Sequence, residues 1–530
     1  MLDQQLNHKS ACRDMSRHRF KLYLNRYNHA LSLADDGAFL RLIWAVNAIQ
    51  SGMERRARGI IEYPREAITQ SIPDQYTIHK WELETIIMSL LTISKDRPRK
   101  GRFRYLNCNQ YRTLRQIAHI LRQVENEEYG LAGSSEDVFD EMHRIAQRQF
   151  GWQRGLFNVE VLYRYVFVYG QGKCAEYFKE RYGISVSTFL KVSIAATLVI
   201  GERPWQNKPT VGDVGITPEQ LDKALAILSI DLDEARTKAG QMVAQVRQNG
   251  RFRIAYQPNL LRQHPIITTK NVMIAPLWQL IIYRATVGLF HDIQTGGQAL
   301  ITEAGHNFEV YVRSLIKGYL PSFEPGGEEK YTYKKNPIDT PDILLRKGGK
   351  IVAVFECKAT KLTYAAQFAE NPFDEAADKY KQLVKGIFQI WRFFSHARRG
   401  IFKGDPVSPE AMGVLLTLDS WMQMSSGLRD RALAEAKTLT ELDPEITDED
   451  RRPIAFAAAS ELDSILRVST DNELLQAFTD AASDNYRGWA IFEVRRDAGG
   501  PLSESKLFPL DFSALLPWFD DISKMASVEE

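Results

Sequence analysis

Apolar residues in the first half of the chain recur at spacings of three and four, which predicts amphipathic helices rather than strands. Two such stripes are Phe39, Leu42, Ile43, Val46 and Ile49, and Leu114, Ile117, Ile120, Leu121 and Val124. Thr217, Pro218 and Gln220 supply an N-cap, a first-turn proline and a capping-box residue, so another helix is expected from Leu221 onward. Residues 20–250 are therefore predicted to be mostly helical. Nothing in their spacing distinguishes a DNA-reading helix-turn-helix from plain core packing.

The pattern changes after about residue 290. Pro276 is expected to open a helix that Arg284 interrupts and that ends near Phe290, and the glycine-bearing stretch 291–297 then marks a domain boundary. Beyond it the sequence predicts a helix over 302–317, two short strands around a glycine turn and a long helix over 374–394. Further apolar runs alternate with helical ones, over 414–418, 428–439, 453–459, 473–482 and 489–494. This alternation indicates an α/β domain at 291–530, a mixed sheet flanked by helices, preceded by a mostly helical region at 1–290.

The length of 530 residues is too great for one compact core, which agrees with two domains. The longest nearly uncharged apolar runs, such as 192–201, fall short of the roughly 18 to 20 residues that cross a bilayer. Charges are scattered through the first twenty residues, so we expect no secretory signal, no membrane association and a cytoplasmic location. The four cysteines form no CxxC pair and are expected to be reduced thiols.

Charge is distributed unevenly along the chain. Residues 1–300 carry +11 and residues 301–530 carry −9, although the whole chain has a net charge of only +2. Within 95–115, basic residues alternate with aromatic ones, as in a surface that binds phosphates and stacks on bases. The residues predicted to bind nucleic acid are Arg99, Lys100, Arg102 and Arg104. A solvated basic loop is the alternative, both here and for a second basic and aromatic stretch at 247–262.

Several common enzyme motifs are missing from the sequence. It contains no GxxxxGK[ST] loop, GxGxxG turn, GxSxG elbow or HExxH helix, so the corresponding nucleotide-binding, hydrolase and zinc-protease classes lose their support. The adjacent pair His291-Asp292 has no further histidine or aspartate partners in the sequence, which is typical of a surface or helix end.

One group of residues predicts a metal site. Asp342 begins a strand-like run, a glycine turn follows, and the apolar run 351–355 leads into Glu356, Cys357 and Lys358. Glu-x-Lys also occurs at 328, 435 and 504, but in loop-like or helical sequence. Alternation along a strand places Glu356 and Lys358 on one face and Cys357 on the other. Two carboxylates on neighbouring strands would repel unless a cation lies between them, and hard oxygen ligands suit Mg²⁺ or Mn²⁺.

The register of this hairpin decides whether the two carboxylates meet. A regular hairpin with a two-residue Gly348-Gly349 loop would pair Asp342 with Phe355 and turn it away from Glu356. A three-residue loop or a bulge would instead align Asp342 with Glu356. We therefore predict this second register, in which one face carries Asp342, Leu344, Val352, Val354, Glu356 and Lys358.

This arrangement resembles the PD-(D/E)xK nuclease superfamily, the fold of many restriction endonucleases, over roughly residues 300–420. The resemblance implies that Asp342 and Glu356 bind the metal, with the main-chain carbonyl of Cys357 as a further ligand, and that Lys358 is catalytic. Family members often add a glutamate from the preceding helix, which Glu309 matches. RecB-type members place a glutamine on the following helix: Gln382 is the choice and Gln389 the competitor, although neither is followed four residues later by the tyrosine usual in that subgroup.

The function that the resemblance implies is Mg²⁺-dependent cleavage of DNA, a chemistry that the family uses in bacterial restriction and in defence against phage. One alternative is the same fold with weak or lost catalysis, used to hold nucleic acid. Another is a helical N-terminal region that recruits a partner protein and regulates an appended nuclease domain. Many relatives cleave as dimers, but the sequence has no signature of a homo-oligomer interface.

Overall fold

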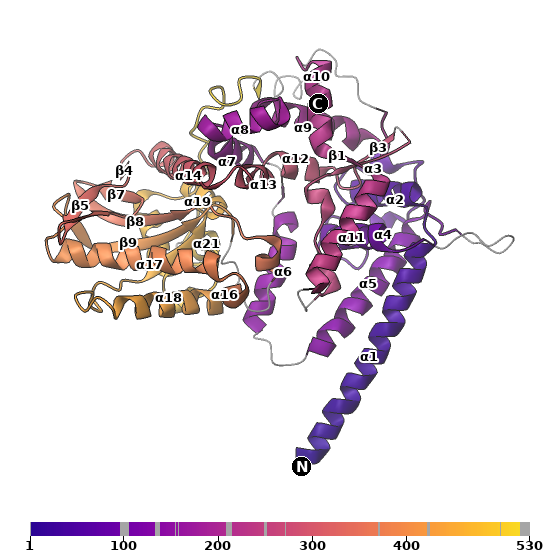
Figure 1. Cartoon of the computed structure of the whole chain (residues 1–530), viewed down its shortest axis with the longest axis horizontal. Coiled ribbons are helices and arrows are strands. Elements are labelled where there is room, and N and C mark those ends of the chain that lie inside the picture. The colour runs from indigo at the N-terminus through magenta and orange to yellow at the C-terminus, as the bar shows by residue number, and fades with distance from the viewer. Residues whose placement is uncertain are drawn as a thin grey trace. The chain divides into compact units, whose positions relative to one another are not determined.

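The computed structural model describes residues 2–95, 105–132, 138–153, 155–156, 158–207, 215–248, 252–270, 272–368, 372–420, 425–498 and 500–519. The chain divides into two compact units (Figure 1). Unit 1 comprises residues 1–136, 151–157 and 178–289, and unit 2 comprises residues 137–150, 158–177 and 290–530. The last division thus falls next to the predicted boundary, while two earlier segments, which the sequence assigned to the N-terminal region, belong to unit 2.

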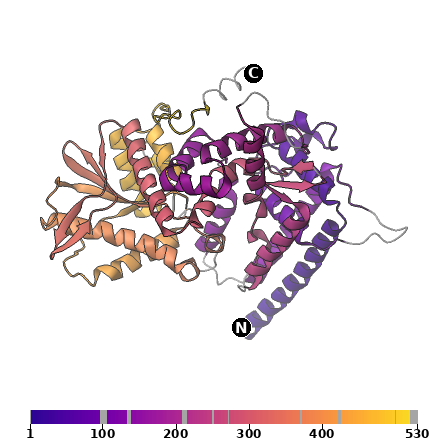
Figure 2. The ribbon, with the colours of Figure 1, turned by 45° about the horizontal axis from the view of Figure 1, so that its top comes forward.

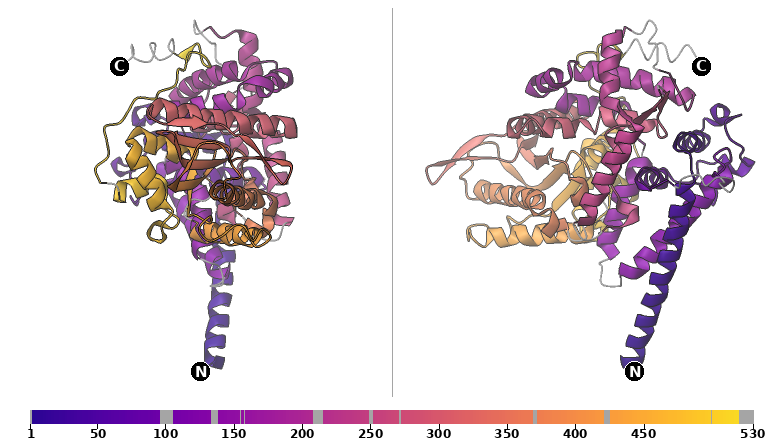
Figure 3. Two further views of the ribbon diagram at one scale, coloured as in Figure 1. Left: turned by 90° about the vertical axis from the view of Figure 1, so that its left-hand side faces the viewer. Right: turned by 45° about the vertical axis from the view of Figure 1, so that its right-hand side comes forward.

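Unit 1 is mostly helical, with one small sheet. Its helices are α1 (Leu2–Ser32), α2 (Asp36–Ile49), α3 (Glu54–Ala57), α4 (Lys80–Thr92), α5 (Tyr111–Ala132), α9 (Val186–Glu202), α10 (Pro218–Leu228), α11 (Leu232–Gln248) and α12 (Gln279–Ala285), with short 3-10 turns at Arg65–Ala67, Ile254–Tyr256 and Leu260–Arg262. The strands β1 (Ser229–Asp231), β2 (Ile266–Thr269) and β3 (Val272–Ile274) form a sheet in that order. Helix α1 packs along α5 (Figures 1 and 3).

The predicted helix signals of unit 1 are confirmed where they were specific. Thr217 caps α10 by accepting a hydrogen bond from the Gln220 N–H at 3.2 Å, and the Gln220 side chain accepts one from the Thr217 N–H at 3.0 Å. The apolar stripe of α2 is fully buried. The expected helix after Pro276 begins only at Gln279 and ends at Ala285, and a separate helix, α13 (Leu289–Gln294), follows it. Between them Gly288 lies so close to Arg284 that a Cβ atom would be 2.7 Å from the Arg284 carbonyl oxygen.

Unit 2 is an α/β structure. Its elements are α6 (Val138–Gln153, whose last turn lies in unit 1), α7 (Val159–Tyr169), the first part of α8 (Gly172–Tyr182), α13 (Leu289–Gln294), α14 (Gln298–Tyr319), β4 (Glu324–Gly326), β5 (Lys330–Tyr333), β6 (Asn336–Asp339), β7 (Ile343–Lys347), β8 (Lys350–Lys358), α15 (Tyr364–Gln367), α16 (Pro372–Glu375), α17 (Ala377–Arg398), β9 (Val407–Thr417), α18 (Ser426–Thr440), β10 (Ile454–Ala458), α19 (Ala459–Arg467), α20 (Asp471–Ala481), a 3-10 turn at Asp484–Tyr486 and α21 (Ile491–Ala498). Most of the apolar run 489–494, which the alternation placed after a helix as a strand-like run, lies in α21, which begins at Ile491.

The sheet of unit 2 has the strand order β10-β9-β8-β7-β4. Strands β4, β7 and β8 are antiparallel neighbours, whereas β9 is parallel to β8 and β10 is parallel to β9. A parallel pair needs a crossover connection, and α17 supplies it between β8 and β9. The predicted mixed α/β sheet is confirmed at this level.

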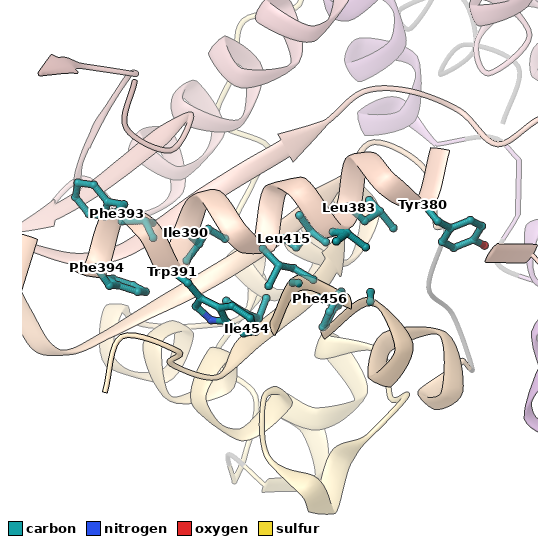
Figure 4. Close-up of a cluster of buried hydrophobic side chains, with 14 of the residues drawn as sticks. Tyr380, Leu383, Ile390, Trp391, Phe393, Phe394, Leu415, Ile454 and Phe456 are labelled. Atoms are coloured by element: carbon teal, nitrogen blue, oxygen red, sulfur yellow. The ribbon is translucent and has the colours of Figure 1, made fainter. Parts of the chain in front are cut away.

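Helices cover both faces of this sheet (Figures 1 and 2). Helix α17 packs on β8 and β9, with α18 packed on its outer side, while α14 and α20 cover the other face. Strand alternation separates the two faces, since Phe355 meets Phe478 of α20 and Val354 belongs to the core under α17. In that core the apolar side of α17, including Leu383, Ile390 and Trp391, points toward β9 and β10 (Figure 4).

A membrane-spanning helix is not evident within the described ranges. No single helix there is both long and apolar enough to cross a bilayer, and only the bent pair α8 and α9 reaches that length and composition together.

Candidate active site at the end of the β7–β8 hairpin

The β7–β8 hairpin has the predicted register, and a bulge produces it. Lys347 pairs with Lys350 across a two-residue Gly348-Gly349 turn, which alone would give the unfavourable register. Pairing then slips between Leu345 and Arg346, because Val352 is an extra residue on β8, and the ladder ends with Ile343 opposite Phe355. Continued by one residue, this register places Asp342, which lies just before β7, opposite Glu356. The bulge also corrects one member of the predicted face: Ile351, not Val352, joins Leu344 and Val354 in the core under α17.

Asp342 lies just before β7 and closes the hairpin through its side chain. Its Oδ2 accepts a hydrogen bond from the Cys357 N–H at 2.6 Å. The residue that would face Cys357 in the ladder is Pro341, which has no N–H to offer. In a strand the N–H and C=O of one residue point to the same side, so the Cys357 carbonyl faces Asp342 and receives no hydrogen bond from Pro341. Burial raises the pKa of Asp342, although Lys358 and the Cys357 N–H offset part of this effect.

Glu356 is the most deeply buried acid of the cluster, with 1% of its surface exposed. Its Oε1 accepts a hydrogen bond from the Lys358 ammonium at 2.7 Å, and its Oε2 is buried with no hydrogen-bond partner. Burial raises the pKa of Glu356 to about 8; Lys358 opposes this shift, and the negative charges of Asp342 and Glu309 add to it. A buried carboxylate oxygen without a partner is costly, so this position favours a proton or a cation beside it.

Lys358 is held by these acids. Burial of its ammonium lowers the pKa, but the charges of Glu356 and Asp342 outweigh burial, and the pKa of Lys358 is raised. The lysine therefore stays charged at neutral pH while its hydrogen bond fixes it against Glu356. Lys358 and Cys357 also border a small cleft of about 120 Å³, lined on its far side by α13 and α14 through Ile293, Ala304 and Gly305. This volume is enough for a few water molecules beside the end of β8.

Glu309 of α14 interacts electrostatically with the same cluster. Burial and the charges of Asp342 and Glu328 together raise its pKa to about 7, against the opposing effect of Arg313. Its Oε2 lies 3.6 Å from Nδ1 of His306, one turn back on the helix. The sequence prediction that Glu309 lies near Asp342 and Glu356 thus has electrostatic support, since each carboxylate affects the pKa of another.

Helix α17 approaches the cluster through Gly386 and Gln382. A Cβ atom on Gly386 would lie 2.8 Å from Cγ of Glu356 and 3.3 Å from Cε of Lys358, so the helix abuts both side chains. Gln382, one turn earlier, accepts a hydrogen bond from the Thr360 hydroxyl at 3.1 Å. Gln382 therefore lies close to the end of β8, bonded to Thr360. Its role as the active-site glutamine stays a prediction.

The ligand set of this cluster is small. Within the described residues, no three histidine, cysteine, aspartate or glutamate side chains converge closely enough to enclose a metal ion. The groups that could hold one are the carboxylates of Asp342 and Glu356, with the Cys357 carbonyl as a main-chain ligand. The donor chemistry fits Mg²⁺ or Mn²⁺, because all three are oxygens and the Glu356 Oε2 is unpartnered.

The predicted nucleic-acid residues Arg99, Lys100, Arg102 and Arg104 lie outside the described residues. In the second basic stretch three arginines that the structure describes are used within the fold. Arg262 forms an ion pair with Glu84 at 2.9 Å, Arg253 is buried over the Tyr129 ring, and Arg247 lies over the ring of Phe252. Cys108, Cys174 and Cys357 are free thiols, as expected.

Sequence reasoning missed two residues of the site. Glu328 was set aside as a Glu-x-Lys in loop-like sequence, yet the charges of Asp339 and Asp342 both contribute to raising its pKa, after burial. Glu328 lies just before the alternating polar and aromatic residues 330–333, and this strand-like pattern was the signal that could have identified it. Gly386 is the residue four positions after Gln382, where RecB-type enzymes usually have a tyrosine. That it lets α17 lie against Glu356 and Lys358 can be seen only in the structure.

Comparisons of this chain with protein-family models, with curated proteins and with solved structures found no match.

Proposed function

We propose that unit 2 is a nuclease that hydrolyses DNA phosphodiester bonds with the help of Mg²⁺ or Mn²⁺. The observation that carries this proposal is the buried Glu356, which faces Asp342 across the hairpin, holds Lys358 with one oxygen and leaves the other without a partner. A merely structural ion pair would not need a second carboxylate at the facing position, because like charges raise each other's pKa and destabilise the fold.

In this proposal Asp342, Glu356 and the Cys357 carbonyl hold the metal, which supplies polarisation of the phosphodiester and a lowered pKa for an attacking water. Lys358 stays protonated and offsets negative charge that develops on the phosphate. Glu309, whose pKa is raised to about 7, can accept or release a proton near neutral pH. The small cleft beside Lys358 offers space for the water.

The order of elements also supports the proposal. The PD-(D/E)xK resemblance implies a helix with a glutamate, a hairpin with the metal ligands and a helix with a glutamine, in that order. The chain has α14 with Glu309, then β7–β8 with Asp342 and Glu356, then α17 with Gln382. A role in bacterial restriction or defence against phage is what this resemblance implies, and it is proposed on that ground alone.

The proposal is tested by incubating the protein with linear, circular and single-stranded DNA in the presence of Mg²⁺ or Mn²⁺. Cleavage by the unaltered protein, lost on adding EDTA and lost in Glu356→Gln and Lys358→Ala, is the expected result. The chain offers a matched control in a second Glu-x-Lys on α18, where Lys437 is exposed and the half-buried Glu435 pairs with Arg431 at 3.2 Å. Glu435→Gln and Lys437→Ala should cleave like the unaltered protein.

Two results would contradict the proposal. Cleavage that persists in the Glu356→Gln variant would place the chemistry elsewhere or in a contaminant. DNA binding without cleavage under every metal condition would favour the alternative function, a nuclease-like fold that holds nucleic acid.

A further inference from the structure

The hairpin β5–β6 ends in a strained turn. Tyr333 pairs with Asn336, and the two residues between them, Lys334 and Lys335, have φ angles of 50° and 67°. Positive φ at both central positions is the type I′ arrangement, which favours Asn-Gly or Gly-Gly because a Cβ atom is disfavoured there. Another two-residue turn of the chain has glycine at both positions, Gly348 and Gly349, with φ angles of 58° and 73°. In the turn between β2 and β3, Lys270 also has a positive φ, of 47°.

Glycine would adopt the backbone angles of the β5–β6 turn without strain, so Lys334 and Lys335 do not favour this turn. Strained backbone held by non-glycine residues tends to occur where side chains are needed for function. Both lysines are exposed, and the hairpin extends from the sheet of unit 2 (Figure 3). We call this pair the lysine turn.

Further cations gather behind the lysine turn. The Lys334 ammonium lies 4.9 Å from the ring centre of Tyr333, and the Arg399 guanidinium approaches the same ring at 5.6 Å from the end of α17. The Arg399 guanidinium forms an ion pair with the exposed Glu445 at 3.5 Å, and its Nη1 is buried without a hydrogen bond. Burial, together with Arg392 and Arg399, lowers the pKa of the neighbouring His396 to about 4, as expected in a positive environment.

The base of the hairpin adjoins the candidate active site. Glu329 and Thr340 close it with two hydrogen bonds of 2.9 Å, and Asp342 follows two residues later. Next to these residues, Asp339 and Asp342 act on the pKa of Glu328. At a rise of about 3.3 Å per residue, the four residues from Asp339 to the turn span roughly 13 Å. A DNA strand in the candidate active site that runs along this hairpin would therefore reach the lysine turn within a few nucleotides.

We propose that the lysine turn, with Arg399 behind it, binds backbone phosphates of the DNA strand that occupies the candidate active site. The inference deepens the proposed function and rests on it for the identity of the ligand. Lysine supplies a flexible point charge suited to phosphate contacts that do not read sequence. The Tyr333 ring beside the two cations offers an aromatic surface of the kind on which bases stack.

The test uses Lys334→Asn, Lys335→Gly and the double variant, made in the full chain carrying Glu356→Gln, with EDTA present so that cleavage plays no part. Binding to a labelled single-stranded DNA is measured over a series of salt concentrations. Each lost phosphate contact should lower the salt slope by about 0.7 and the affinity about fivefold at 0.1 M salt, and the double variant should lose roughly 25-fold. Lys437→Asn, on α18, is the charge-matched control and should bind like the parent.

Thermal unfolding gives a second, opposite readout, because Asn-Gly relieves the strained turn. The double variant should melt at a higher temperature than its parent while binding DNA more weakly. The inference is overturned if the double variant keeps its affinity and salt slope, if Lys437→Asn loses as much affinity, if the melting temperature falls, or if the parent binds no DNA at low salt. A parent that binds through these lysines while the unaltered protein cleaves nothing would refute the nuclease proposal alone.

Discussion

Replacing Gly386 by alanine tests how closely α17 and the candidate active site depend on each other. In a helix interior alanine is favoured over glycine by about 1 kcal/mol, so the substitution should stabilise the protein if space were available. Space is not available: the new Cβ would lie 2.8 Å from Cγ of Glu356 and 3.0 Å from Cδ1 of Leu415. Ordinary carbon contacts are about 3.5–4.0 Å, so the overlap approaches 1 Å on two sides.

Overpacking of this kind costs about 1–3 kcal/mol, and the gain in helix propensity offsets part of it. We therefore expect Gly386→Ala to lower the free energy of unfolding by about 0–2 kcal/mol. The effect on cleavage should be much larger, because Glu356 is buried and bonded to Lys358 and must move with it. A displacement of about 1 Å at reacting groups can reduce the rate roughly 100-fold.

The assay combines denaturant unfolding with initial rates of DNA cleavage at saturating Mn²⁺. Gly240→Ala is the matched control, since Gly240 is also inside a helix, α11, and a Cβ there meets nothing within 4 Å. That variant should gain about 0.5–1 kcal/mol of stability and cleave normally. A Gly386→Ala protein that is stabilised like the control, or that cleaves at the normal rate, would refute the reasoning.

Three further predictions concern the acids, the bulge and the buried ion pair. Because the pKa of Glu356 is raised to about 8 from its usual 4.5, metal must displace a proton, and the affinity for Mg²⁺ measured by calorimetry should rise up to about tenfold per pH unit from pH 6 to 8. The same shift makes the metal-free protein lose stability as pH rises from about 4.5 through 8, and an affinity independent of pH would contradict both statements. Deleting Val352 removes the extra residue and should give a regular hairpin in which Leu345 still pairs with Ala353, so the circular dichroism of the sheet and the metal affinity should both remain; lost metal binding would show that the bulge itself positions Asp342. Asp463→Ala should lower the free energy of unfolding by about 3–5 kcal/mol, because it leaves the buried Arg164, now 2.8 Å from Asp463, without a counter-charge, and a loss under 1 kcal/mol would mean that Arg164 reaches water.

The sequence predicted correctly those elements that depend on interactions between residues close together in the chain. The capping box at Thr217 and the stripe of α2 depend only on neighbouring residues and could be recognised directly. The hairpin register was predictable for a different reason. Only one register of the hairpin places Asp342 near Glu356, and a shared metal ion requires that register. The register could therefore be predicted from the two carboxylates, although the bulge at Val352 had no sequence signal.

What escaped prediction depends on distant or weak interactions. Strands β5 and β6 were missed because they are short, exposed and polar, and because Pro337 lies inside β6. The membership of α7 in unit 2 could not be read from periodicity either. Its apolar face resembles any other core helix, and its partner Asp463 lies 299 residues away from Arg164. The electrostatic coupling of Glu328 to Asp342 likewise appears only once the base of the β5–β6 hairpin is in place.

The discontinuous course of unit 2 has a consequence for its synthesis. Helix α7 leaves the ribosome long before α14 and α19, which supply Tyr311 and Asp463 to the buried Arg164. Until those residues are translated, α7 lacks the partners that bury its arginine, so unit 2 cannot complete its core while the chain is growing. A fragment that starts at residue 290 would lack α7 and leave the buried Asp463 permanently without the counter-charge of Arg164.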